Sequence, residues 1–302
     1  MLKHLLAAGA AILCLSAPAA AQQIADPAYA PKLEAPAYTE QGPSVAIDDA
    51  HRNFHTLEGR YAPFGKLLEA DGYKVSALTM PLSAEALATV TVLVIGNAQS
   101  APPETSAFTL EEIAATHAWV EAGGSLLLLA DHAPYGGAAA DLARSFGVEM
   151  GQGYVAAHQE GKVTFAIDYS GQQLGDHVIF HGRSEKEEVR QVRTFTGQSL
   201  SVPDGAVALL GLPADAIEVA TPLEAGALLK GETPPGRAMG GRAQAVAMTL
   251  GKGRVVIAGE AAMFSAQTVS RPNQPIRYMG LTVADDQQFA LNTLHWLSHL
   301  ID

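Results

Sequence analysis

Residues 125–137 read SLLLLADHAPYGG, an apolar run that passes directly into a polar turn containing Pro and Gly. A run without alternation of polar and apolar residues is typical of a strand that is covered on both faces. Three further runs share this pattern, at residues 44–47, 90–95 and 254–258. Because strands covered on both faces belong to parallel sheets, the four runs predict one parallel sheet.

Helical patterns separate these runs. Residues 57–70 place apolar side chains on one stripe, and a capping box at Thr109 to Glu112 opens a helix that ends at the glycine pair 123–124. Further helices are predicted over residues 137–146 and about 283–300. Strands that alternate with helices through right-handed crossovers predict an α/β domain of three layers.

The chain start has the pattern of a secretory signal peptide. A basic residue at Lys3 precedes an apolar run over 5–15, and an Ala-Ala-Ala sequence ends at Ala21. We therefore expect residues 1–21 to be removed and the product to be periplasmic or extracellular. No later stretch approaches the roughly 18 consecutive apolar residues of a membrane span, so none is expected.

The remainder is predicted to form one domain with an insertion. Residues 22–43 are rich in Ala, Pro and Tyr without periodicity, which indicates a flexible leader. The single α/β domain is expected over 44–302. Within it, residues from about 151 to 242 show short strand patterns joined by Gly, Pro and Asp turns, which predicts a β-rich insertion.

Composition excludes several classes of function. With 302 residues that are 48% hydrophobic and 17% charged, the chain can bury a sizeable core, and its net charge of −12 disfavours nucleic acid as a partner. The one cysteine, Cys14, lies within the expected signal peptide. The exported form would therefore have no disulfide, no cysteine-ligated zinc or iron–sulfur cluster, and no cysteine nucleophile.

Every apolar run of the predicted sheet is followed by polar side chains. Asp48 and Asp49 follow the first run, Asn97 the second, Asp131 and His132 the third, and Glu260 the fourth. The carboxyl ends of parallel strands meet at one edge, where open α/β sheets bind ligands. The alternative is that these groups cap the helices that follow. A convergent site is the interpretation that accounts for all four at once.

The densest polar cluster lies at residues 48–56. Zinc binds imidazole nitrogen and carboxylate oxygen, so a divalent metal such as zinc could be held by Asp49, His51 and His55. The spacing matches no metalloprotease helix, and the alternative is a hydrogen-bonded loop. The candidate ligand-binding side chains are Asp48, Asn53 and Asn97.

The turn at residues 131–137 is the candidate catalytic segment. It has no G-x-S-x-G sequence and no cysteine, so a nucleophile elbow would lack its nucleophile. Acid–base chemistry remains, with His132 titrating near neutral pH and Asp131 or Glu260 orienting it or activating water. The alternative is a His–Asp pair that only rigidifies the loop. An ester hydrolase based on Ser265 would require an imidazole beside that hydroxyl.

Several stretches of the chain resemble the class I glutamine amidotransferase-like superfamily, in its branch of secreted bacterial domains of unknown function. These domains are similar to the N-terminal domain of an intraflagellar-transport protein and to gliding-motility transporter components. The resemblance implies a flavodoxin-like, doubly wound parallel sheet. It does not imply amidotransferase activity, since Asp131-His132 stands where true members carry the catalytic cysteine. The stretches that carry the resemblance are residues 49–53, 119–124, 127–136, 195–200, 253–257 and 292–297.

The sequence thus predicts a secreted, cysteine-independent hydrolase acting on a small polar or carbohydrate-like substrate by His/Asp acid–base chemistry, with or without a divalent metal. The alternative is a noncatalytic ligand-binding or scaffold module with a protein partner in the cell envelope. An enzyme should bring several of the candidate side chains together in a concave site. A scaffold should use them for backbone caps and expose a large apolar patch elsewhere.

Overall fold

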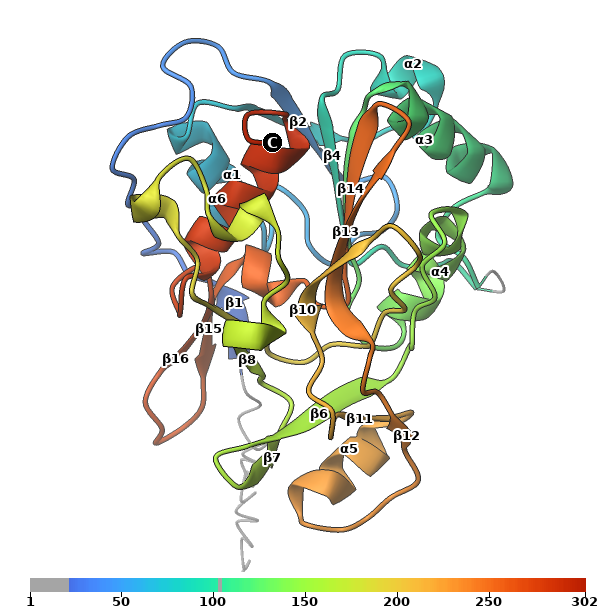
Figure 1. The fold of residues 1–302 in the computed structure, drawn as a ribbon, viewed down its shortest axis with the longest axis vertical. Helices are drawn as coiled ribbons and strands as arrows, with labels where there is room; N and C mark the ends of the chain where they lie inside the picture. Colours follow the sequence, from blue (N-terminus) through green and yellow to red (C-terminus); the bar gives the residue numbers. More distant parts are fainter. Residues whose placement is uncertain (1–21, 103–104) are drawn as a thin grey trace, which may run out of the picture.

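A seven-stranded sheet forms the centre of the molecule in the computed structural model, which describes residues 22–102 and 105–302 (Figure 1). Its strand order is β10-β13-β14-β5-β4-β2-β3, and the five strands from β14 to β3 are parallel. The mixed α/β class and the parallel-rich sheet predicted from the sequence are confirmed. The strands are β2 (Ser44–Asp48), β3 (Lys74–Leu78), β4 (Val92–Gly96), β5 (Ser125–Leu129), β10 (Val207–Gly211), β13 (Ala243–Leu250) and β14 (Gly253–Ala258).

Helices cover both faces of this sheet. The core on one face joins α1 (Ala62–Ala70) and α6 (Asp286–Leu297) to side chains such as Ile47 and Leu127. The core on the other face joins α3 (Leu110–Ala122) and α4 (Tyr135–Ser145) to Leu126 and Leu128, beside the short helix α2 (Ala84–Leu87). All four leucines of β5 are fully buried, and each such burial contributes about 1.5–3 kcal/mol. This explains why the predicted run had no alternation.

The capping box that begins α3 is present as predicted. The Thr109 hydroxyl accepts from the backbone N–H of Glu112, and the Glu112 carboxylate accepts from the backbone N–H of Thr109. The helix ends at Gly123, whose φ of +125° suits glycine.

The prediction of a flexible leader over residues 22–43 is wrong. Strand β1 (Gln22–Ala25) pairs with β15 (Ala266–Ser270), which pairs with β16 (Arg277–Gly280) in a separate three-stranded sheet. Further along, Tyr29 is buried, and its hydroxyl donates to Gln287 Oε1 at 2.9 Å. A few contacts with residues distant in the sequence hold this segment in place. Because such contacts produce no periodic pattern, the sequence alone did not indicate them.

The stretch predicted as a β-rich insertion contains several small elements. Its four-stranded sheet and α5 lie at one end of the molecule, whereas the 3₁₀ turn at Val178–Phe180 lies beside α6 (Figure 1). A four-stranded sheet has the order β12-β11-β6-β7, and β8 pairs with β9. One strand of the stretch, β10, instead joins the central sheet beside β13, so the insertion is tied into the main core. The elements are β6 (Tyr154–Gln159), β7 (Lys162–Thr164), β8 (Asp168–Ser170), β9 (Gln191–Arg193), β11 (Ile217–Val219), α5 (Pro222–Leu229) and β12 (Arg237–Ala238), with 3₁₀ turns at Gly171–Gln173, Val178–Phe180 and Glu185–Glu187; a fourth 3₁₀ turn, Ala262–Phe264, follows β14.

The expected signal peptide, residues 1–21, lies outside the described residues. In the parts of the chain that are described, no helix combines the length and apolar character needed to cross a bilayer.

Candidate active site

All four predicted strand ends lie at one edge of the central sheet, and those of β4, β5 and β14 are joined there by hydrogen bonds. The backbone N–H of Asn97, just after β4, donates to the carbonyl of Leu129 at 2.9 Å. The N–H of Ala130, just after β5, donates to the carbonyl of Ala258 in β14 at 3.0 Å. Parallel pairing therefore brings the residues after β4, β5 and β14 side by side, as the sequence predicted.

Asn97 links these strand ends. Its side-chain oxygen accepts from the backbone N–H of Asp131 at 2.8 Å, and its amide nitrogen donates to Asp131 Oδ2 at 2.7 Å and to His55 Nδ1 at 3.1 Å. The residue is fully buried and has φ +50°, a conformation that Asn tolerates better than most residues. Asn97 was predicted to bind ligand. The geometry instead makes it the residue that positions His55 and Asp131.

The carboxyl groups of Asp131, which is half-buried, and of Glu260, which is buried, both belong to this cluster. Asp131 Oδ1 accepts from the N–H of Ala261 at 2.6 Å, and the two oxygens of Glu260 accept from the N–H groups of Ala262 and Met263 at 2.9 Å. Burial raises the pKa of Asp131 against the opposing hydrogen bond from Asn97. Burial and the nearby charge of Asp131 raise the pKa of Glu260 well above its usual range. Glu260 is therefore the group best placed to keep a proton at neutral pH.

His132 supplies an imidazole beside this pair. Its Nδ1 lies 2.8 Å from the carbonyl of Ala133, an acceptor only, so Nδ1 carries the proton and Nε2 of the neutral ring is an acceptor. The ring stacks on Tyr154, with centroids 4.3 Å apart and planes at 22°. The stack and the hydrogen bond fix the ring.

These groups line a pocket of about 260 Å³. His55, Asp131, His132 and Glu260 form its ionisable part. Its other walls carry the aromatic rings of Phe54, Tyr135 and Phe195 and the polar side chains of Gln23, Thr196 and Gln267.

Two strands outside the central sheet complete the pocket. Gln23 comes from β1 and Gln267 from β15, and the Gln23 amide donates to Gln267 Oε1 at 2.9 Å. Neither glutamine was predicted as a site residue, because only the pairing of β1 with β15 brings them to the pocket. Tyr135 lies within the candidate catalytic segment, and its place in the strand-to-helix turn is the sequence feature that could have identified it as a site residue.

His51, in the polar cluster at residues 48–56, has a structural role. His51 Nδ1 lies 2.9 Å from both oxygens of Asp48, and its Nε2 lies 2.9 Å from Glu112 Oε1 at the start of α3. Burial alone would lower the pKa of His51, but the two carboxylates together raise it. Asn53 donates to Asp48 Oδ2 at 3.0 Å. Asp48, His51, Asn53 and Glu112 thus form a buried hydrogen-bonded cluster, called the clamp below. Asp48 and Asn53, which were predicted to bind ligand, belong to it.

The predicted metal ligands do not form a site. Both ring nitrogens of His51 are engaged, and Nδ1 of His55 accepts from Asn97. The side chain of Asp49 takes part in none of the hydrogen bonds found in the described structure. Across residues 22–102 and 105–302, no group of three or more His, Cys, Asp or Glu side chains is arranged to hold a metal ion. The residues therefore do not fit zinc in the predicted arrangement.

Ser265 does not meet the requirement for a nucleophile. Its hydroxyl is fully buried, donates to the carbonyl of Ala262 at 2.7 Å and accepts from Gln267 at 2.6 Å. No imidazole of the described chain is bonded to it. The ester hydrolase based on Ser265 is therefore excluded.

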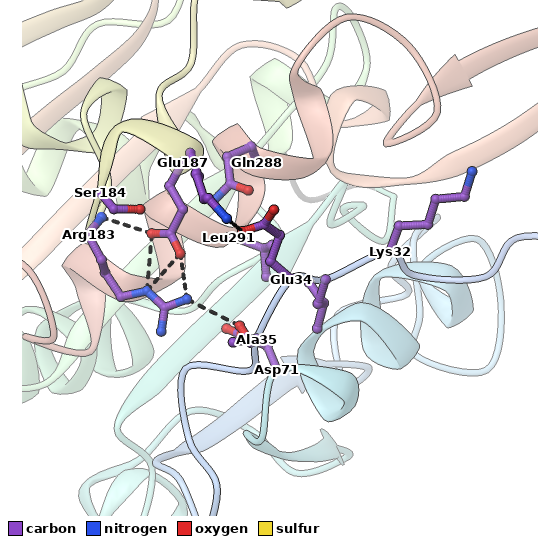
Figure 2. A pocket seen from close by; sticks show the side chains of 11 residues that line it. Lys32, Glu34, Ala35, Asp71, Arg183, Ser184, Glu187, Gln288 and Leu291 are labelled. Carbon is purple, nitrogen blue, oxygen red and sulfur yellow. Dashed lines mark hydrogen bonds and ion pairs between the residues drawn. The ribbon is translucent and has the colours of Figure 1, made fainter.

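A larger cavity of about 490 Å³ lies elsewhere, between residues 32–35 and the segment around Arg183 (Figure 2). Figure 2 shows the Arg183 guanidinium bonded to Glu187 and to the carbonyl of Ala35. Lys186, which also lines it, pairs with Glu34 at 2.6 Å. Because these charges neutralise one another within the protein, this cavity is a weaker candidate than the smaller pocket.

Comparison with known proteins supports the fold. No protein-family model and no curated protein matches the chain. Among solved structures, 84% of this chain aligns with 97% of the mmIFT52 N-terminal domain, with a TM-score of 0.59 and 15% identity. In fold, the chain is similar to that domain. The resemblance drawn from the sequence is thus confirmed at the level of fold, and an identity this low carries no statement about activity.

Two more distant likenesses are to bacterial proteins. A ThuA-like protein from Bacteroides uniformis ATCC 8492 gives a TM-score of 0.46 at 12% identity, covering 89% of this chain and 94% of that one. A cytoplasmic protein from Salmonella typhimurium LT2 gives 0.47 at 15% identity, covering 85% and 99%. The mmIFT52 domain and ThuA-like proteins belong to the glutamine amidotransferase-like fold.

The raised pKa values predict that the free energy of unfolding falls as pH rises from 6.5 to 8.5. In the folded state, burial raises the pKa values of Glu260 and Asp286 well above their usual range. The carboxylates of Asp48 and Glu112 raise the pKa of His51. The folded state then holds protons that the unfolded chain, with pKa values of about 4 for carboxyls and about 6.5 for His, has released. Each such proton lowers stability by at most about 1.4 kcal/mol per pH unit.

Urea unfolding at several pH values measures this slope. Glu260→Gln, which cannot release the proton, should flatten it. A stability that stays constant or rises over this window would contradict the assignment. Below pH 6.5 the trend is opposed by His55 and His177, whose pKa values burial lowers to about 3 and about 4, so the test is restricted to the higher range.

Proposed function

We propose that this protein is a cysteine-independent hydrolase with a flavodoxin-like, glutamine amidotransferase-like fold, acting on a small polar or carbohydrate-like substrate. The observation that carries the proposal is the pocket that His132 lines together with the carboxyl groups of Asp131 and Glu260. A base and a protonated acid in one small pocket are the groups that hydrolysis by acid–base catalysis requires.

Each group has a distinct role in this proposal. Nε2 of His132 is an acceptor and can take a proton from a water molecule as that water attacks the substrate. Glu260, whose pKa is raised, can give a proton to the leaving group. Asp131 keeps the pKa of Glu260 high by its charge, and Asn97 holds Asp131 in place. No step requires a cysteine, a serine or a metal ion.

The walls of the pocket support a polar, carbohydrate-like substrate. Phe54, Tyr135 and Phe195 offer ring faces, and the amides of Gln23 and Gln267 offer donors and acceptors. Pockets for small molecules combine such apolar surfaces with a few polar groups that fix the orientation of the ligand. A volume of about 260 Å³ limits the part of the substrate that is enclosed to a small molecule.

Export belongs to the same proposal. The basic start, the short apolar run and the Ala-Ala-Ala sequence support removal of residues 1–21 and a periplasmic or extracellular location. An active site without a thiol suits an oxidising compartment, because it contains no group that a disulfide exchange would block.

A screen of hydrolysis tests the function. Residues 22–302 would be incubated with a panel of small esters, amides and glycosides, next to Thr196→Trp, in which a large ring fills the pocket. We expect at least one compound class to be cleaved by the natural sequence and not by Thr196→Trp. Absence of cleavage over the whole panel, or equal cleavage by the filled variant, would contradict the proposal.

The second candidate is a binding or scaffold module with a partner in the cell envelope. It is favoured by α5, where Leu223 and Leu229 have 83% and 62% of their surface exposed. A partner that covered these two side chains would remove their apolar surface from water. Capture of an envelope protein that is lost with Leu223→Ser and Leu229→Ser, together with a negative hydrolysis screen, would favour this candidate.

A further inference from the structure

Two buried hydrogen-bond donors near the pocket have no acceptor. His55 Nε2 and Arg60 Nε are almost entirely buried, and neither has a hydrogen-bond partner among the described residues. A buried donor left without an acceptor is destabilising, so such groups are rare unless a ligand or a water molecule satisfies them. The two residues lie in the segment between β2 and α1.

The proton of His55 can be placed from its neighbours. Asn97 accepts from the N–H of Asp131 through its oxygen, so its amide nitrogen is the atom that faces His55 Nδ1. Nδ1 is therefore an acceptor, and the neutral ring carries its proton on Nε2. Burial and the charge of Arg60 lower the pKa of His55 to about 3, which keeps the ring neutral. His55 lines the pocket as a neutral donor that lacks an acceptor.

Arg60 brings a positive charge next to the pocket, in contact with two of the residues that line it. Its guanidinium carbon lies 3.8 Å from the centre of the Phe54 ring, and its Nη2 donates to the carbonyl of Gln23 at 3.3 Å. Phe54 and Gln23 both line the pocket. Within the described part of the chain no carboxylate pairs with Arg60, although Arg183, Arg190 and Arg193 each pair with one. In a chain with net charge −12, this cation at the pocket is uncompensated.

We propose that the pocket selects substrates that carry a carboxylate, with Arg60 and His55 as the donors that receive it. The planar guanidinium fits a carboxylate through two parallel hydrogen bonds, and desolvation by Phe54 strengthens the interaction. The acidic pair Asp131 and Glu260 belongs to the same pocket, so the reacting bond would lie next to that pair and the carboxylate next to Arg60. This inference rests on the proposed function and specifies its substrate class as an acidic sugar or a similar small polar acid.

Binding of three probes tests the inference. D-glucuronate, D-glucose and inorganic phosphate would be titrated into ¹⁵N-labelled protein, with Arg60→Gln, Arg60→Lys and Arg52→Gln as variants. Arg52 is an exposed arginine of the same segment and serves as the matched control. We expect glucuronate to bind at least tenfold more tightly than glucose and to shift the Nε2 resonance of His55. Arg60→Gln should weaken glucuronate at least tenfold, Arg60→Lys less, and Arg52→Gln not at all.

The other outcomes overturn the inference. Equal affinity for glucose and glucuronate, no binding of any probe, or full affinity in a folded Arg60→Gln variant would show that the two donors do not select an anion. Tighter binding of phosphate than of glucuronate would overturn the assignment to a carboxylate. Thermal unfolding of each variant shows whether it is folded.

The proposed function and this inference can fail separately. If glucuronate binds through Arg60 but the panel is not hydrolysed, the proposed hydrolase fails and the carboxylate site stands. If the panel is hydrolysed without any preference for acidic substrates, the carboxylate site fails and the hydrolase stands.

Discussion

Replacement of Asp48 by alanine should destabilise the protein by about 3–5 kcal/mol, the cost of removing one partner from a buried ion pair. Asp48 is fully buried at the end of β2 and bonds to both His51 and Asn53. Without it, His51 loses the partner of Nδ1, and the remaining contact with Glu112 leaves the clamp incomplete. Equilibrium unfolding in urea measures the loss.

The neighbouring carboxylate is the matched control for this prediction. Asp49 is only partly buried, and its side chain takes part in none of the hydrogen bonds of the described residues. Asp49→Ala should change the free energy of unfolding by no more than about 0.5 kcal/mol. The predicted metal site included Asp49 and not Asp48, so a large loss of stability in Asp49→Ala, accompanied by loss of a bound divalent ion, would contradict the clamp and favour the metal hypothesis.

Replacement of His132 by alanine should lower the rate of hydrolysis by about 10²- to 10⁴-fold, the usual contribution of a positioned general base. The loss follows because Nε2 of His132 is the acceptor assigned to the attacking water. Stability should fall only slightly, since the stack on Tyr154 is worth about 0.5–1.5 kcal/mol. Initial rates on the best compound of the panel measure the effect.

His158→Ala controls for the removal of an imidazole. His158 is largely exposed in the insertion and lies 3.2 Å from Asp215, away from the pocket. Its replacement should leave the rate unchanged. A His132→Ala variant that is folded and as active as the natural sequence would show that this histidine is not the base, whatever the pocket binds.

The sequence predicted the central sheet because its strands are governed by burial. Leu126 to Leu129 are covered on both faces, so each position had to be apolar, and the uninterrupted run was visible. The convergence of Asn97, Asp131 and Glu260 followed from the same argument, since parallel pairing fixes which residues meet at the sheet edge. The start of α3 was predicted because a capping box is local.

The failed predictions depend on contacts that are distant in the sequence. The role of His51 is decided by Glu112, 61 positions away, which competes with any metal for Nε2. The leader is held by the pairing of β1 with β15 and by the bond from Tyr29 to Gln287. His295, near the end of α6, is also placed by a distant contact: it is fully buried and bonds to Asp71 at 2.7 Å.

The central chemical claim is that the pocket holds a proton on a carboxyl group, next to the base His132, at neutral pH. A titration of the Glu260 side-chain carbon by ¹³C NMR tests it without knowledge of the substrate. We expect Glu260 to titrate well above the ordinary range of a glutamate carboxyl, because of its burial, and we expect Asp131→Asn, which removes the neighbouring charge, to lower this pKa. Full ionisation of Glu260 near its ordinary value of about 4.3 would contradict the account, because the pocket would then have no acid to give.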